Sequence, residues 1–242
     1  MKFPLKTMVL GIAMLSASPI FAQNLTSGRT QFDATAVAKA TAAREPSGLR
    51  SAAFLGLRTL INDLAKDLKA GSLPSGFPFD VNDLSELKTA ELGLGFEVYS
   101  AHPQTLLAGG RPFEQMVMGT GVWNFVVLVD KHPVALLEME KFNGKWQVNG
   151  AGASKLAQDV MASTQNHAGR NAFRFIRIYQ ATADFLEVKD LEGKAKFAPL
   201  IAARQSLRMT NAIAADASLA GGQDILPSLQ EAVRGHLDRF GK

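Results

Sequence analysis

Hydrophobic residues recur at helical spacing towards both ends of the chain. In the N-terminal part they follow one another at steps of three and four residues, at Phe54, Leu57, Ile61, Leu64 and Leu68. Positions with this spacing lie on one side of an α-helix and form a stripe that packs against a core. A second stripe, after Pro227, comprises Leu229, Val233, Leu237 and Phe240. The pattern therefore predicts an amphipathic helix near each end of the chain.

The middle of the chain follows a period of two instead. Apolar and polar residues alternate over residues 92–99, which predicts a strand with one buried face. An antiparallel meander of three strands is expected next, at 122–130, 134–141 and 146–149. Its first strand is apolar on both faces for most of its length, which is typical of a central strand covered on both sides. The first turn is expected at Lys131-His132. The second is Asn143-Gly144, the dipeptide that a type I′ hairpin turn prefers.

The remaining segments show either the helical spacing of hydrophobic residues or the alternation that is typical of strands. A helix is expected at 154–163, a strand pair at 173–180 and 184–189, and another helix from Pro199. Runs of strands and runs of helices, rather than strict alternation, favour an α+β fold with an antiparallel sheet. We expect that sheet to contain the three-strand meander, one preceding strand and the further strand pair. Amphipathic helices from both ends of the chain would pack against it.

The N-terminus has the three parts of a cleavable secretory signal. Lys2 and Lys6 are followed by a short apolar run and then by Ala22, which is small enough for the position before a signal-peptidase cut. An anchor across a bilayer core of ~30 Å needs about 20 apolar residues, more than this run contains. An uncleaved anchor is the alternative. We therefore expect a signal peptide at 1–22 and a soluble mature chain in a bacterial periplasm or in the medium.

Composition and the spacing of hydrophobic residues divide the rest of the chain into three parts. These are an N-terminal helical segment (23–80), an α+β core domain (81–220) and a C-terminal helix that packs on the core (221–242). The two glycines at the start of the last part are expected to form its flexible joint.

Composition narrows the classes of function. The chain of 242 residues contains no cysteine, so a disulfide, a thiol nucleophile and a lipid anchor on cysteine are excluded. A domain of about 200 residues buries roughly 70% of its unfolded surface, and a hydrophobic content of 47% supplies that core. Removing residues 1–22, which contain two lysines and no acid, lowers the formal net charge from +4 to +2. The basic residues are scattered rather than clustered, so no nucleic-acid partner is expected.

Ser85 and Lys88 match the S-x-x-K pattern of penicillin-recognising enzymes. One helical turn brings the amine towards the hydroxyl, which it could activate. The companion motifs are missing, because the chain has no Ser-Asp-Asn and Lys88-Thr89-Ala90 lacks the glycine of Lys-Thr-Gly. The alternative interpretation is a short helix with a solvated, charged side.

Other catalytic and metal-binding patterns are weak. The four histidines, His102, His132, His167 and His236, lack the i, i+4 spacing of a helical zinc pair, so no metal or cofactor is predicted. The segment from Gly150 to Lys155 ends a strand and begins a helix, but it lacks the spacing of a phosphate-binding loop. We interpret it as a tight turn with Ser154 as helix N-cap.

The meander predicts one mixed sheet face. With two-residue loops in both hairpins, Phe125 lies opposite Glu138. One end of the face then carries two aromatic and four polar side chains: Trp123, Phe125, Glu138, Glu140, Gln147 and Asn149. This mixture is typical of a surface that binds a peptide or a cationic ligand. A solvated sheet end is the alternative, and a slip of one residue would move each side chain to the other face.

These patterns favour an exported, soluble, non-enzymatic binding or accessory domain. It would engage a peptide, a protein or a small ligand on the mixed face, without a cofactor and without a membrane span after signal cleavage. One alternative is an exported hydrolase, whose first candidates are Ser85, Lys88 and the loop histidines. The neighbouring carboxylates of Glu138 and Glu140 could also split their pKa values for acid–base work. A further alternative is a carrier that holds an apolar ligand between the sheet and its helices.

Overall fold

The computed structural model describes residues 34–68, 73–167, 172–209 and 219–240. The expected signal peptide at 1–22 lies outside these residues. The strands are β1 (Glu91–Ala101), β2 (Val117–Val129), β3 (His132–Phe142), β4 (Lys145–Gly152), β5 (Arg174–Ile178), β6 (Ala183–Lys189) and β7 (Ala195–Pro199). The longer helices are α1 (Ala34–Ala42), α2 (Leu49–Asp67), α5 (Ser154–His167) and α7 (Gly222–Phe240). Shorter helical segments are η1 (Leu84–Thr89), α3 (Pro103–Ala108), α4 (Phe113–Met116), η2 (Tyr179–Ala181) and α6 (Ile201–Ser206).

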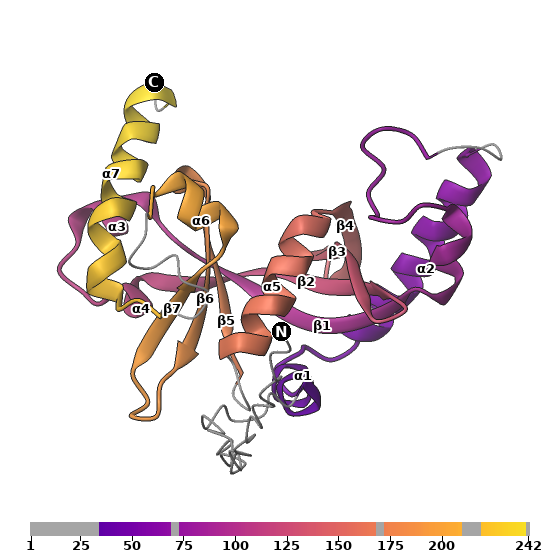
Figure 1. The fold of residues 1–242 in the computed structure, drawn as a ribbon, viewed down its shortest axis with the longest axis horizontal. Coiled ribbons are helices and arrows are strands. Elements are labelled where there is room, and N and C mark those ends of the chain that lie inside the picture. Colours follow the sequence, from indigo (N-terminus) through magenta and orange to yellow (C-terminus); the bar gives the residue numbers. More distant parts are fainter. Residues whose placement is uncertain (1–33, 69–72, 168–171, 210–218, 241–242) are drawn as a thin grey trace, which may run out of the picture.

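The strands form one seven-stranded sheet in the order β4-β3-β2-β1-β5-β6-β7 (Figure 1). Neighbouring strands are antiparallel except for β1 and β5, which are parallel. The α+β class and the antiparallel-rich sheet are confirmed. The prediction of six strands was one too few, because 195–199 forms an edge strand. Pro199, expected in a helix, ends this strand opposite Phe185, where the lack of an N–H is tolerated.

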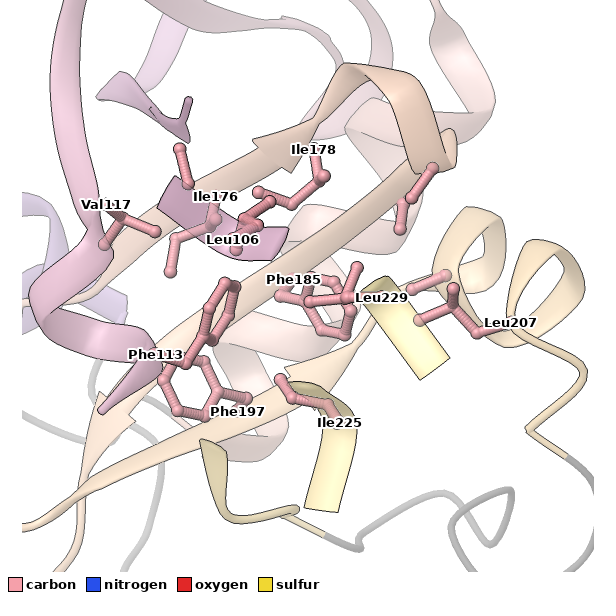
Figure 2. Close-up of a cluster of buried hydrophobic side chains, with 14 of the residues drawn as sticks. Leu106, Phe113, Val117, Ile176, Ile178, Phe185, Phe197, Leu207, Ile225 and Leu229 are labelled. Atoms are coloured by element: carbon pink, nitrogen blue, oxygen red, sulfur yellow. The ribbon is translucent and has the colours of Figure 1, made fainter. Parts of the chain in front are cut away.

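Helices cover both faces of the sheet. One face packs α2 over β2 to β4 and packs α7, with α3 and α4, over β5 to β7; we call it the α2/α7 face. Figure 2 shows the cluster beneath α7, in which Leu229 and Ile225 lie against Phe185 and Phe197. The opposite face packs α5 and α1 against the middle of the sheet, and we call it the α5 face. In Figure 1, α5 crosses in front of the sheet, with α7 and α2 on either side.

The two predicted helical stripes are partly correct. In α2, Leu57 and Ile61 are buried as expected, but Phe54 is 46% exposed and lies under the guanidinium of Arg58. The buried stripe runs through Ala53 instead, at steps of four residues. Because this step keeps residues on one side of a helix, the neighbouring Phe54 is turned away from the sheet.

The last helix, α7, begins earlier than its stripe suggested and ends at Phe240, the last residue of the stripe. It starts at Gly222, so Pro227 lies inside the helix rather than before it. Leu229 and Val233 are fully buried, whereas Phe240 is 68% exposed and stacks on His236. The C-terminal turns of α7 project beyond the neighbouring elements (Figure 1), so the sheet offers Phe240 no surface to pack against.

The second hairpin has the predicted turn. Asn143 and Gly144 both have positive φ, 50° and 78°, and Glu140 lies opposite Gln147 as expected. Beyond that pair a β-bulge places Gly150, not Asn149, opposite Glu138. A bulge adds one residue to one strand, so the predicted register holds only up to it.

The first hairpin corrects the predicted register. Its turn is formed by Asp130 and Lys131, both with positive φ, rather than by Lys131-His132. This turn alone would shift the expected pairing by two residues, which keeps every side chain on its face. A β-bulge between Val127 and Leu128 reduces the shift to one residue, so Phe125 lies opposite Leu137 instead of Glu138, and Trp123 lies opposite Met139 instead of Glu140. A slip of one residue moves the side chains of β2 to the other face relative to β3. The observed register buries the aromatic residues with Leu137 and Met139 beneath α2.

Candidate ligand-binding site

The six residues of the expected binding face lie on two faces. Trp123 and Phe125 are 5% and 0% exposed and belong to the core beneath α2. The polar four are Glu138, Glu140, Gln147 and Asn149, and they lie on the α5 face because their strands alternate with Leu137, Met139 and Val148 of that core. The mixed aromatic–polar face is therefore wrong as a surface, for the register reason given above. A binding role for its individual residues stays a prediction.

Two of those polar residues adjoin a pocket on the α5 face. Asn149 donates a hydrogen bond from Nδ2 to Glu138 Oε1 at 2.6 Å, with a longer one to Glu140 Oε1 at 3.3 Å. Next to Glu138 is a hollow of about 230 Å³ between the sheet and the start of α5. Its lining residues are Asn124, Leu136, Glu138, Gly150, Ala151, Gly152, Ala153, Leu156 and Arg177. We call this hollow the Asn124 pocket.

Asn124 is the central residue of the pocket and was missed from the sequence. It lies on β2 opposite Phe96 of β1 and opposite Glu138 of β3, and it is 4% exposed. Its amide forms no side-chain hydrogen bond within the described residues. Although the residue as a whole is buried, its amide atoms are not among the fully enclosed, unpartnered atoms of the described residues, so they reach the open space of the pocket. The available signal was a single polar residue in the apolar run of 122–130.

Arg177 enters the pocket wall from β5 and is held by a carboxylate. Its Nε and Nη2 donate to Asp184 Oδ1 and Oδ2 at 2.8 and 3.0 Å, and the side chain of Asp184 is 8% exposed. Burial by itself lowers the pKa of Arg177, but the hydrogen bonds and charge of Asp184 outweigh it and raise the pKa above its usual value. Nη1 donates no hydrogen bond within the described part of the chain. The guanidinium is thus charged and oriented, with one amino group free.

The acidic residues of this region also act on Tyr179, which follows β5. Burial is the main cause that raises the pKa of Tyr179 above 10.0. Arg177 lowers this pKa, whereas the charges of Glu138, Asp184 and Glu140 raise it. Charged groups on β3, β5 and β6 therefore lie close enough to Tyr179 to act on its hydroxyl, at this end of the α5 face.

A second hollow, of about 340 Å³, lies near the start of β5. Its lining residues are Thr41, Arg44, Gly95, Phe96, Glu97, Tyr99, Trp123, Phe173 and Arg174. We call it the Trp123 hollow. Its charged groups on the sheet already have partners: Arg174 pairs with the buried Glu187, and Glu97 accepts from the Gly121 amide at 3.3 Å. Burial, then the charge and hydrogen bond of Glu97, raise the pKa of Tyr99 above 10.0.

The residues considered for catalysis are not brought together. Ser85 and Lys88 are both exposed on η1, where Asp83 and Glu86 form the capping box that begins the segment. His102 precedes α3, and His132 follows the β2–β3 turn. His167 ends α5, and His236 stacks on Phe240. Across the described ranges, no three His, Cys, Asp or Glu residues cluster as metal ligands.

The turn between β4 and α5 is a tight connection, as interpreted, in which Ala153 has a positive φ of 55°. The predicted N-cap is wrong, because α5 begins at Ser154 and Ala153 accepts the first helical hydrogen bond, from the Ala157 amide. In the part of the chain that the structure describes, no helix has the length and apolar character needed to cross a membrane.

Comparisons with protein-family models, with curated proteins and with solved structures yield no match. The class that the fold and the pocket define is therefore an α+β protein with a small polar pocket between its sheet and a helix N-terminus.

Proposed function

We propose that this chain is an exported, non-enzymatic binding protein that holds a small polar ligand in the Asn124 pocket. The observation that carries the proposal is the Asn124 amide, which is 4% exposed and unpartnered within the described residues, yet lines a pocket. Buried polar groups almost always have a partner. A ligand that supplies both an acceptor and a donor would satisfy this amide.

The size and chemistry of the pocket support a small, polar ligand. Drug-sized ligands occupy about 300–1,000 Å³, and the pocket holds about 230 Å³. Asn124 and Arg177 supply donors, and Glu138 supplies an acceptor. None of the lining residues carries a hydroxyl or thiol side chain, so the pocket offers no serine-type or cysteine-type nucleophile, which favours binding over a hydrolase of that kind.

A panel of small metabolites tests the proposal. The panel contains free amino acids, short carboxylic acids, amines and polyols, and ligand-observed NMR measures binding to the 23–242 chain. We expect at least one member to bind the parent chain and to lose binding in Asn124→Leu, which removes the amide and keeps the side-chain size. Circular dichroism shows whether the variant is folded.

Thr164→Val is the matched control. Thr164 Oγ1 is also buried and unpartnered within the described residues, but it does not line the pocket. This variant should bind like the parent chain. If no panel member binds, or if folded Asn124→Leu binds as well as the parent chain, the proposed function is wrong.

Export is a separate part of the proposal and rests on the N-terminal pattern. Expression in a bacterial host should deliver a chain that begins near Gln23 to the periplasm or medium. N-terminal sequencing of the exported fraction measures this. An intact Met1 on the recovered protein would contradict cleavage.

A further inference from the structure

The Asn124 pocket has unused hydrogen-bonding atoms on charged groups of both signs. The charge of Arg177 is balanced by Asp184 and is also felt by Glu138, but Glu138 has only the neutral Asn149 and no cationic side chain as hydrogen-bond partner. Its Oε2 accepts no hydrogen bond within the described residues. Glu138 therefore offers a free, negatively charged acceptor at the β3 side of the pocket.

The opposite sign comes from α5 and from Arg177. Gly152, Ala153 and Leu156 line the pocket, so the N-terminus of the 14-residue helix α5 borders it. The first N–H groups of a helix lack intrahelical partners and carry a partial positive charge. Arg177 adds its free Nη1 from the other side. The buried, unpartnered Asn124 is the independent sign that this helix terminus faces a ligand rather than solvent alone.

The strand order sets the spacing of these groups. Glu138 lies on β3, Asn124 on the adjacent β2, and Arg177 on β5, which follows β1 in the sheet. Neighbouring strands are about 4.8 Å apart, so the side chains of Asn124 and Glu138, which are register partners, are adjacent, and the long side chain of Arg177 reaches the same pocket from β5. An amide can donate and accept at the same time, which suits a ligand with charges of both signs.

We infer that the ligand is a free α-amino acid, bound with its ammonium group at Glu138 and its carboxylate at Arg177 and the α5 N-terminus. The inference rests on the proposed function and names its ligand class. A simple cation would use only the Glu138 acceptor, and a simple anion would use only the donors of Arg177 and of the α5 N-terminus. A zwitterion uses both, with the Asn124 amide beside the group that Glu138 binds.

Matched ligands test this inference. Isothermal titration calorimetry compares the free amino acids with their carboxamides, which lack the carboxylate, and with their N-acetyl derivatives, which lack the ammonium group. We expect each derivative of a binding amino acid to bind about 10- to 100-fold more weakly, the factor for losing one charge-assisted hydrogen bond.

Variants assign the two ends of the ligand. Glu138→Gln should lower the affinity for the free amino acid about 10- to 100-fold. The affinity for its N-acetyl derivative, which has no ammonium group, should change by less than about twofold. Glu91→Gln removes an exposed carboxylate of β1 outside the pocket and is the matched control, expected to change the affinity less than twofold.

The outcomes separate the inference from the proposed function. If other panel members bind and depend on Asn124 while amino acids do not, the inference is wrong and the proposed function stands. The inference is also wrong if a derivative binds the parent chain as tightly as the free amino acid does. The same holds if the Glu138→Gln variant binds the free amino acid as tightly as the parent chain does. If nothing binds, both fail.

Discussion

The Asn124 pocket and the Trp123 hollow differ in how their polar groups are partnered. In the Trp123 hollow, Arg174 and Glu187 form a buried pair that Lys189 extends at 3.5 Å. In the Asn124 pocket, an amide that is almost as buried as Glu187 has no partner within the described residues. Paired buried groups hold a fold together, whereas an unpaired one weakens it. The difference favours the pocket as the binding site, although the Trp123 hollow is larger.

The two hollows also differ in how their edges are packed. The carboxylate of Glu97, which lines the Trp123 hollow, lies against Gly119 and the Gly121 amide, and an added Cβ at Gly119 would collide with it. Gly150 of the Asn124 pocket has nothing within 4 Å of an added Cβ. The side chain of Glu97 is thus held by its neighbours, whereas the backbone at Gly150 leaves room.

Breaking the ion pair of the Trp123 hollow should have the largest effect. Arg174→Met leaves the carboxylate of Glu187, 3% exposed, with only the exposed Lys189. We expect the free energy of unfolding to fall by about 3 kcal/mol, the lower end for a buried pair that loses one partner, because Lys189 remains. Urea denaturation measures it. A loss below about 1 kcal/mol would show that the pair is not structural.

Removing a fully enclosed, unpartnered hydroxyl should have the opposite sign. Thr164→Val should raise the free energy of unfolding by about 1 kcal/mol, because Thr164 Oγ1 is buried without a partner in the described residues. Asn124→Leu should change it by less than about 0.5 kcal/mol, because the Asn124 amide keeps contact with the open pocket. Of the two variants, only Asn124→Leu should affect ligand binding. A gain of about 1 kcal/mol or more for Asn124→Leu in urea denaturation would mean that the amide is enclosed in solution.

Alanine at the two glycines compares the packing directly. Gly119→Ala should displace the Glu97 carboxylate from the Gly121 amide and destabilise the fold by about 1 kcal/mol, the value of a hydrogen bond to a charged group reduced by its exposure. Gly150→Ala should change stability by less than about 0.5 kcal/mol, as at an unhindered surface position. Equal effects in urea denaturation would contradict the difference in packing.

The smallest effect is expected in alkaline solution. The pKa of Tyr99 lies above 10.0 in the fold through burial and Glu97. Unfolded chains therefore lose this proton at lower pH than folded ones, so the stability contribution is complete below pH 10 and falls as the pH rises towards the folded value. Tyr99→Phe should remove part of this loss, measured as unfolding free energy against pH.

Tyr179 provides the comparison from the other region. Its pKa is also raised, and the chain contains only these two tyrosines. Absorbance titration of Tyr99→Phe and Tyr179→Phe therefore reports each hydroxyl separately. Both midpoints should lie above 10.0, and a midpoint below that value for either residue would contradict the environment described for its hollow.

Much of the local structure could be predicted. The strand at 122–130, covered on both sides, and the Asn143-Gly144 turn are observed, because both depend on patterns within a few residues. The edge strand ending at Pro199 was missed, since proline is tolerated both at a helix start and at an edge strand. The parallel pairing of β1 with β5 had no local signal, because it joins strands separated by the whole meander and α5.

The candidate site could be predicted only in part. Glu138 was found, because it lies in a strand with an evident alternation. Asn124 was assigned to an apolar run, and Arg177 was read as part of an ordinary strand. The expected association of Glu138 with Phe125 failed because a β-bulge between Val127 and Leu128, which the sequence did not indicate, changes the face of one strand relative to the other.

The sequence by itself determined which segments become helices and strands, since hydrophobic period and turn residues act over a few positions. Only the tertiary structure decided which sheet face each side chain of the meander occupies, because a β-bulge shifts the register by one residue and so exchanges the faces. It also decided that Asn124, Glu138 and Arg177 meet. Their strands are adjacent or nearly so in the sheet, but the burial of side chains beneath α2, α5 and α7, not local preference, selects that order.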